Sequence, residues 1–86
     1  MINIRNEEFV KAFGEHLRYL RKASGLSQEK LSYAADVPLS QIGRIERGEV
    51  NPTISTIYSI SKALRVSPQE LLAFELAQSI PSSAKE

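Results

Sequence analysis

Apolar side chains recur at helical spacing near the start of the chain. The repeating positions are Phe9, Phe13, Leu17 and Leu20. Residues three or four apart lie on the same side of a helix, so these side chains make one apolar stripe with charged residues around it. Asn6 is placed to cap this helix, and Gly25 is placed to end it, because glycine readily adopts the left-handed conformation that follows a helix. The pattern predicts a first helix between these two residues.

A second, short helix is predicted after Gly25. Ser27 is a suitable N-cap, because its hydroxyl can accept a hydrogen bond from a free backbone N–H of the first turn. From there the apolar positions again follow helical spacing up to Ala35, with Leu31, Ala34 and Ala35 on the inner face. This helix is expected to be about two turns long.

The corner after the second helix contains residues suited to a sharp turn. Asp36 tolerates a positive φ, and Pro38 fits the start of a helix, where its missing N–H would be unpaired in any case. A third helix over about residues 38–47 places Ile42 and Ile45 on one side, at about 100° per residue. The opposite side carries small and basic residues, namely Ser40, Gly43, Arg44 and Arg47.

Two further helices complete the predicted architecture. The fourth is expected over residues 53–64, with inward positions at Ile54, Ile57, Ile60 and Leu64. The fifth begins at Ser67, Pro68 and Glu70, which supply an N-cap, an N1 proline and the acid of a capping box. The sequence therefore predicts one all-α domain of five helices over residues 1–80, followed by a polar tail over residues 81–86.

Composition narrows the class of protein. The chain has 86 residues, enough for one hydrophobic core, and it has no cysteine, which excludes disulfides and thiolate metal sites. It also contains no apolar run of about 18 residues, the length that indicates a membrane span, and no signal sequence. We expect a cytoplasmic protein without membrane association.

The charge balance alone does not indicate a nucleic-acid partner. There are 11 Lys or Arg residues against 10 Asp or Glu residues, a net charge of +1. Any DNA contact must therefore depend on where the charges lie, since phosphates are bound by one local surface. Two short helices joined by a tight corner have the geometry needed to place the second one in a major groove about 12 Å wide. Many helical proteins contain such a pair for purely architectural reasons, so geometry alone leaves both readings open.

Three stretches of the sequence favour the DNA-binding reading. They are FGEHLRYLRKASGL (13–26), SQEKLSYAADVPLSQIGRIERG (27–48) and NPTISTIYSISKALRVSPQELL (51–72). In this order they closely resemble the Xre/Cro/phage-repressor family of helix-turn-helix regulators. The resemblance implies a five-helix, lambda-repressor-like domain of bacterial or phage type. It also implies binding to operator DNA, commonly as a symmetric dimer, through a helix-turn-helix over about residues 27–47.

The resemblance also implies roles for particular residues. Arg21 and Glu46 match a family pair whose salt bridge ties the first helix to the third. The positions that face base edges are Leu39, Ser40, Gln41 and Arg44, of which Arg44 could form a bidentate contact with guanine. The positions that contact phosphates or position the backbone are Ser27, Gln28, Gly43, Arg47 and Asn51. The alternative to a phosphate contact at Gln28 is that this residue lies at an ordinary solvated helix end.

The chain departs from the family pattern at several positions. Asp36 replaces the usual corner glycine, and Pro38 replaces the usual cap serine. Gly43 replaces a polar residue in the third helix, which would let the helix backbone approach DNA closely. Glu49 and Val50 occupy positions where relatives often carry basic residues, so we expect modest affinity for phosphates.

The remaining candidates point to no other chemistry. His16 has no cysteine or second histidine with which to bind a metal, so a structural role is expected. The serines and threonines have no partnered base, and a glycine-rich phosphate loop is absent, so neither an enzyme nor a cofactor is expected. Tyr19, Tyr33 and Tyr58 are expected to pack, although Tyr33 could contact a phosphate.

Apolar residues late in the chain exceed what the five helices need. Phe74, Leu76 and Ile80 either close over the monomer or form a dimer seam, and we favour the seam. A symmetric homodimer would place two recognition helices about 34 Å apart, which matches a palindromic operator with half-sites one DNA turn apart.

Two functional hypotheses follow. The first is a sequence-specific regulator of transcription, a repressor or autoregulator such as a phage-type repressor or a controller linked to restriction-modification. The second is a protein-interaction module that keeps the fold without DNA affinity, which the near-neutral charge and Leu39 favour slightly. No small-molecule effector is implied, because no sensory segment follows the predicted reading head.

Overall fold

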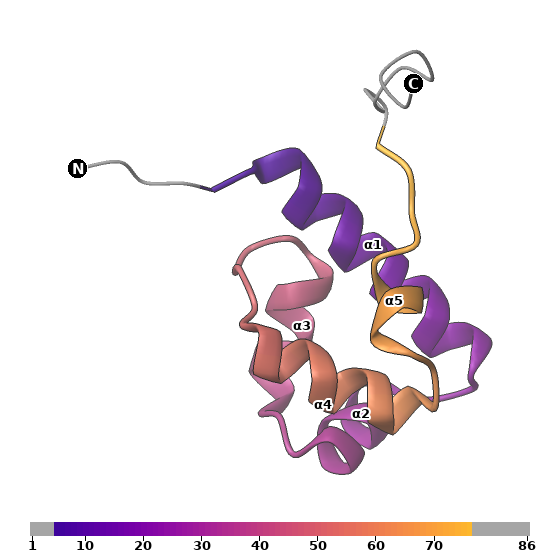
Figure 1. Ribbon diagram of the computed structural model, residues 1–86. Helices are drawn as coiled ribbons and strands as arrows, with labels where there is room; N and C mark the ends of the chain where they lie inside the picture. Colours follow the sequence, from indigo (N-terminus) through magenta and orange to yellow (C-terminus); the bar gives the residue numbers. More distant parts are fainter. Residues whose placement is uncertain (1–4, 77–86) are drawn as a thin grey trace.

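Five helices make up the computed structural model, which describes residues 5–76 (Figure 1). They are α1 (Glu7–Ala23), α2 (Gln28–Ala35), α3 (Leu39–Glu46), α4 (Ile54–Leu64) and α5 (Pro68–Leu71). Helix α1 packs on α3 and α5, whereas α2 packs on α3 and α4, and α4 also contacts α5. No strand occurs within residues 5–76, so the all-α prediction with five helices is confirmed.

Local signals determine where most helices begin. The hydroxyls of Ser27, Thr53 and Ser67 each accept a hydrogen bond from a backbone N–H of the first turn, at 3.0–3.2 Å. These bonds satisfy donors that have no partner within the helix. Asn6 occupies the N-cap position of α1, but its side chain makes no capping hydrogen bond.

A residue in the left-handed conformation follows each of the first four helices. These residues are Gly25 (φ 75°), Asp36 (φ 58°), Gly48 (φ 74°) and Arg65 (φ 61°). The sequence indicated the first three, since glycine and aspartate tolerate this conformation. Arg65 was not expected, because a long side chain with a Cβ is disfavoured there.

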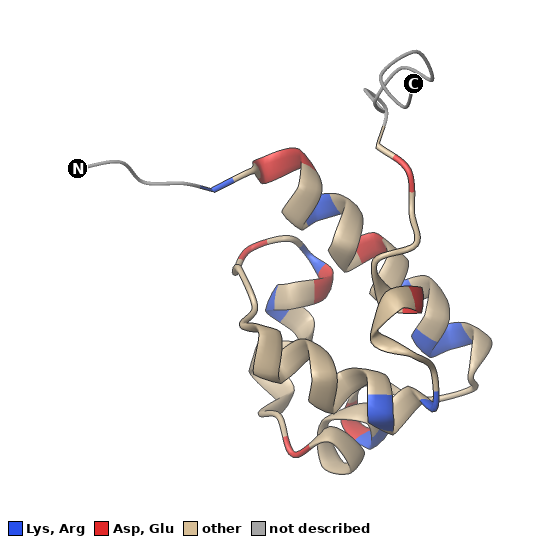
Figure 2. Cartoon of the chain, viewed as in Figure 1, with Lys and Arg blue, Asp and Glu red and all other residues tan. Residues whose placement is uncertain are grey.

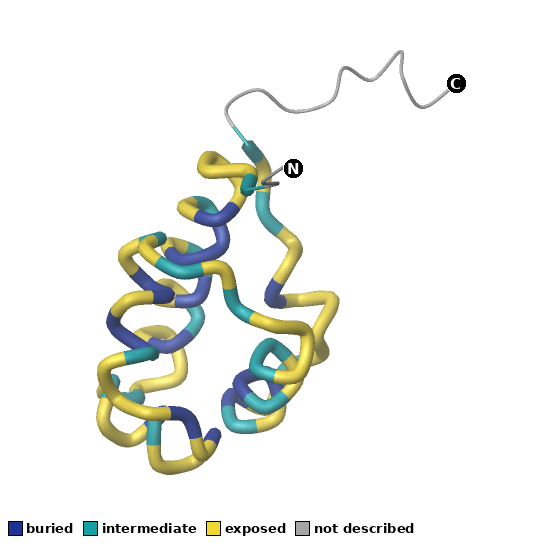
Figure 3. Tube along the Cα trace, turned by 90° about the vertical axis from the view of Figure 1, so that its left-hand side faces the viewer, coloured by how far each residue is buried: buried dark blue, intermediate teal, exposed yellow. Residues whose placement is uncertain are grey.

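The core lies between the helices and is almost entirely aliphatic. Buried positions, dark blue in Figure 3, recur along the inward sides of the helices. The core consists of Phe13, Leu17, Leu31, Ala35, Val37, Ile42, Ile45, Ile60, Leu64 and Leu71. Each helix contributes at least one of these side chains, so all five are joined by the same apolar cluster.

Several predicted inward positions are wrong. Ile54 is 84% exposed, because it is the first residue of α4 and lies beyond the helices that cover the later turns. Ala34 is exposed on α2, where Leu31 and Ala35 fill the inner face. Phe9 is 42% exposed, and Val10 takes the inward position on the first turn of α1.

The backbones of α1 and α3 meet at Gly14. A Cβ atom built on Gly14 would lie 2.7 Å from the carbonyl oxygen of Glu46 and would also collide with the carbonyl of Ile45. Separations this short are sterically forbidden, so no other residue fits at this crossing without moving one helix. The glycine therefore fixes how closely α3 is held against the longest helix.

The segment after α5 folds back on α1. Helix α5 is a single turn that ends at Leu71, and the Phe74 ring then packs beside Phe9 and Phe13, with ring centroids 5.0 and 6.5 Å away. The His16 Nε2 atom lies 2.8 Å from the Glu70 carbonyl oxygen, and since a carbonyl only accepts, the imidazole donates this bond. His16 thus ties α5 to α1.

This arrangement changes the predicted dimer seam. Phe74 is half-buried and packs against the core of its own chain, which favours the alternative that it closes over the monomer, and its place at a dimer seam stays a prediction. Leu76 is half-buried at the end of the described residues, and Ile80 lies outside them. Among the helices of residues 5–76, none is long and apolar enough to cross a bilayer.

Candidate nucleic-acid interface

The corner between α2 and α3 is fixed by Ser32 and Val37. The Ser32 hydroxyl donates to the Val37 carbonyl oxygen at 2.5 Å, and the Val37 N–H donates to the Ser32 carbonyl oxygen at 3.1 Å. The Val37 side chain is buried in the core, which holds the corner from inside. The left-handed conformation of Asp36 reverses the chain between these contacts. Sequence reasoning missed the roles of Ser32 and Val37.

Helix α3 has one fully buried side and one open side. Ile42 and Ile45 are 0% exposed and anchor the helix in the core. The predicted base-edge residues lie on the other side: Leu39, Ser40 and Arg44 are exposed, and Gln41 is half-buried. The side chains on this open side of α3 are therefore accessible to a binding partner.

Arg21 and Glu46, which the family resemblance pairs, form a buried ion pair between α1 and α3. The Arg21 Nε and Nη2 atoms donate to the two carboxylate oxygens of Glu46, at 2.5 and 3.1 Å. The Arg21 Nη1 atom donates to the Leu26 carbonyl oxygen at 2.8 Å. The two residues are 7% and 6% exposed. Arg21 is therefore a structural cation with its donors directed inward.

Gln28 joins this network. Its amide Nε2 donates to a Glu46 carboxylate oxygen at 2.9 Å, which connects the first turn of α2 to the last turn of α3. The predicted phosphate contact of Gln28 thus competes with an internal bond, and the amide has only one N–H left over. The neighbouring Ser27 hydroxyl accepts the capping hydrogen bond of α2, which leaves its O–H able to donate to a phosphate. No sequence signal marked Gln28 as a partner of the pair.

A second, exposed ion pair lies just after α3. The Arg47 Nε and Nη2 atoms donate to the two carboxylate oxygens of Glu49, at 2.8 and 3.3 Å. This hydrogen bond lowers the pKa of Glu49, and the nearby charge of Arg44 acts in the same direction. In Figure 2, acidic and basic segments lie next to each other around this end of α3. The predicted phosphate contact Arg47 thus already has an anion as partner.

The close approach of DNA expected at Gly43 stays a prediction, and in the free protein the Arg47 side chain lies over this position. Gly43 is buried, and a Cβ atom built on it would lie 3.0 Å from the Arg47 Nη1 atom. The guanidinium of Arg47, one turn later, covers this part of the helix. Access to the Gly43 backbone therefore depends on movement of the Arg47 side chain.

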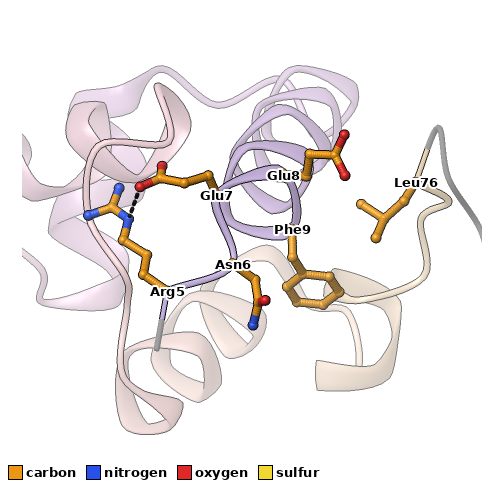
Figure 4. A pocket seen from close by; sticks show the side chains of 6 residues that line it. All are labelled: Arg5, Asn6, Glu7, Glu8, Phe9 and Leu76. Atoms are coloured by element: carbon orange, nitrogen blue, oxygen red, sulfur yellow. Dashed lines mark ion pairs between the residues drawn. The ribbon is translucent and has the colours of Figure 1, made fainter. Parts of the chain in front are cut away.

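Other polar groups lie around this face. Asn51 is exposed in the loop before α4. No role was predicted for Arg5, yet its Nη2 atom donates to the Gly48 carbonyl oxygen at 3.0 Å, directly after α3. Figure 4 shows the Arg5 side chain beside Glu7, on the opposite side of a surface hollow from Phe9 and Leu76. Arg5 thus supports the end of α3 from the first described residue.

Exposed apolar and aromatic side chains complete the surface. Tyr33 on α2 is 91% exposed, which contradicts the expectation that it packs. Ile54 and Tyr58, one turn apart on α4, are 84% and 53% exposed, and Leu72 is 44% exposed. Within residues 5–76 no group of three or more potential metal ligands occurs.

Comparison with known proteins places this geometry in context. A family model described as helix-turn-helix matches residues 17–71. The control protein C.BamHI of Bacillus amyloliquefaciens is 44% identical over 63 residues, covering 72% of this chain and 78% of that protein. The control protein C.SmaI of Serratia marcescens is 40% identical over 65 residues, covering 76% of this chain and 77% of that protein. The crystal structure of the restriction-modification controller protein C.AhdI from Aeromonas hydrophila superposes with a TM-score of 0.71 at 40% identity, covering 72% of this chain and 94% of that one.

Proposed function

The chain belongs to the helix-turn-helix family, and from this premise we propose that it is a sequence-specific regulator of transcription that reads duplex DNA with α3. The observation that carries the proposal is the two-sided character of α3. Its inner side is anchored by two fully buried isoleucines, while its outer side presents the polar Ser40, the cationic Arg44 and the apolar Leu39. A rigid helix of this kind fits the major groove.

The outer side of α3 contains groups that can distinguish base pairs. Arg44 can donate two hydrogen bonds to guanine, and Ser40 can bond to either a base or a phosphate. Leu39, 43% exposed, offers apolar contact to a thymine methyl group, and the amide of Gln41 can pair with adenine. Ser27, Gln28, Arg47 and Asn51 are proposed to position the backbone of the DNA.

The similarity to control proteins suggests the biological setting. Two relatives are named as control proteins, and a similar structure is that of a restriction-modification controller. We propose that this chain acts in the cytoplasm as a repressor or autoregulator of the same kind. An enzymatic activity is not part of this proposal, because the relatives are named as regulators.

A homodimer on a palindromic operator is part of the proposal. Because Phe74 is used within the chain, the exposed residues Ile54 and Tyr58 on α4, together with Leu72, are the better candidates for the seam. Changing Ile54 to Asp should shift the protein toward monomer in analytical ultracentrifugation without loss of helicity, since this side chain is not part of the core. An unchanged sedimentation coefficient would rule out this seam.

The test of DNA reading is selection of bound oligonucleotides from a random duplex pool. Arg44→Ala should then relax the preference at one base position by about 1–3 kcal/mol. Arg18→Ala is the matched control, because Arg18 is an exposed arginine on α1. Unchanged preference in the Arg44 variant would refute the assigned reading face. Absence of binding to any duplex at low salt would favour a protein-interaction module.

A further inference from the structure

We propose that Glu49 is an internal ligand of the phosphate-binding site of Arg47, so that DNA must displace its carboxylate to bind there. The inference rests on the proposed function, specifically on Arg47 as a contact to a backbone phosphate. In this role Glu49 influences the affinity of DNA binding and its salt dependence. Glu49 itself makes no contact with DNA.

The geometry of the pair resembles that of a guanidinium bound to phosphate. Arg47 uses Nε and Nη2 toward both oxygens of one carboxylate, at 2.8 and 3.3 Å. Guanidinium groups bind phosphates through the same two-pronged arrangement of donors. The side chains are 59% and 50% exposed, so a DNA strand could reach both. The carboxylate therefore occupies donors that a phosphate would otherwise take.

The backbone holds Glu49 in this position. After α3 the chain turns through Gly48 at φ 74°, and the N–H groups of Gly48 and Glu49 donate to the carbonyl oxygens of Ile45 and Arg44, at 3.0 and 2.9 Å. This is the Schellman arrangement, which closes the end of a helix. The turn also packs on α1, since a Cβ atom on Gly48 would lie 2.8 Å from Cγ of Lys11. The fixed turn thus keeps the backbone of Glu49 close to Arg47.

The charges favour occupation of the site in the free protein. The Glu49 carboxylate is ionised at neutral pH, as an ordinary glutamate is, and the hydrogen bond from Arg47 lowers its pKa further. An exposed ion pair is weak, so a phosphate can displace it. When Arg47 exchanges Glu49 for a phosphate, the DNA releases a cation but the freed carboxylate attracts one. This contact should then add little to the salt dependence of binding.

The experiment compares Glu49→Gln with the wild-type chain, using fluorescence anisotropy of a labelled duplex over a series of salt concentrations. Both the selected duplex and a mixed-sequence duplex are used, because a phosphate contact does not depend on base sequence. Glu49→Gln should bind both duplexes about two- to fivefold more tightly at low salt. The slope of log K against log salt should become steeper, by at most about 0.9, the value for one additional phosphate contact.

Two matched variants separate this mechanism from a general charge effect. Glu15→Gln removes an exposed carboxylate from α1 and should change the affinity and the slope less. In an Arg47→Gln background, Glu49→Gln should give no gain. The inference is overturned if Glu49→Gln binds no more tightly than Glu15→Gln, or if its gain persists without Arg47.

Failure of this inference can be distinguished from failure of the proposed function. If Arg44→Ala alters base preference while Glu49→Gln has no effect, only the role of Glu49 is wrong. If neither the wild-type chain nor Glu49→Gln binds any duplex at low salt, the proposed function is wrong, and the role of Glu49 with it. Circular dichroism checks that each variant remains helical.

Discussion

Removal of the Glu46 carboxylate should destabilise the domain strongly. In Glu46→Ala the Arg21 guanidinium would stay at the junction of α1 and α3, where its side chain is only 8% exposed. Of its internal bonds only the one to the Leu26 carbonyl would remain. Breaking a buried pair in this way costs about 3–5 kcal/mol, because an uncompensated charge is left behind. Small domains have total stabilities of about 5–15 kcal/mol, so this loss is a large share of the total.

Urea denaturation followed by circular dichroism measures this change. With a slope of about 1–2 kcal/mol per molar urea for a domain of this size, the midpoint should fall by at least about 1.5 M. The exposed carboxylate of Glu15 provides the control, since Glu15→Ala should shift the midpoint only slightly. The double variant Arg21→Met with Glu46→Leu should recover much of the loss, because both charges are then removed from the buried site.

Two results would refute this reasoning. A loss below about 1 kcal/mol in Glu46→Ala would mean that the pair behaves like an exposed one. A double variant as unstable as the single one would mean that the loss comes from altered packing or from the orphaned Gln28 amide, and not from a stranded cation.

Three further predictions use the same assay. Gly14→Ala should destabilise the domain by about 1–3 kcal/mol, because the added Cβ meets the backbone of α3. Gly43→Ala should stabilise the domain by up to about 1 kcal/mol, because its Cβ meets only the end of the Arg47 side chain and alanine favours a helix over glycine. Arg65→Gly should stabilise by about 1 kcal/mol, since φ is 61° there, whereas Arg65→Ala should not; equal effects would refute the strain argument. Folding lowers the pKa of Glu49 below its ordinary value of 4.5, so the stabilisation from its ion pair is fully present above that pH and is lost as the pH falls through the folded pKa. The stabilities of the wild type and of Glu49→Gln should therefore converge in acid. A difference in stability that stays constant with pH would contradict this.

Element boundaries were predictable from the sequence where the signals are local. Serine at residues 27 and 67 was expected to cap a helix, and each hydroxyl accepts the expected hydrogen bond. Asp36 was expected at a positive φ, because its side chain tolerates it, and it has one. These features depend on a few adjacent residues, so knowledge of distant contacts was not needed.

The buried faces were less predictable because they depend on neighbouring helices. Ile54 continues the apolar period of α4, yet its side chain is 84% exposed, and burial begins later in the helix. Arg65 adopts a left-handed conformation that its own chemistry disfavours, and the turn brings the half-buried Val66 against the core. Phe74 follows a single-turn helix and folds back on α1, a contact between residues far apart in sequence.

The candidate site shows the same division. The resemblance implied the Arg21–Glu46 pair, but Gln28 as a third member depends on the packing of α2 against α3. The contact of Arg47 with Glu49 could not be inferred from helix periodicity, because residues two apart do not face each other on a helix. It exists because the chain leaves the helix through a left-handed glycine between them.

The crossing at Gly14 has a mechanical consequence. At Gly14 the backbone of the last turn of α3 lies directly against the backbone of α1, with no side chain between them at that point. A reading element mounted in this way has little freedom to tilt or slide in order to accommodate an imperfect site. We therefore expect selectivity between DNA sites to depend on how easily each sequence bends, because the duplex deforms more readily than α3 does.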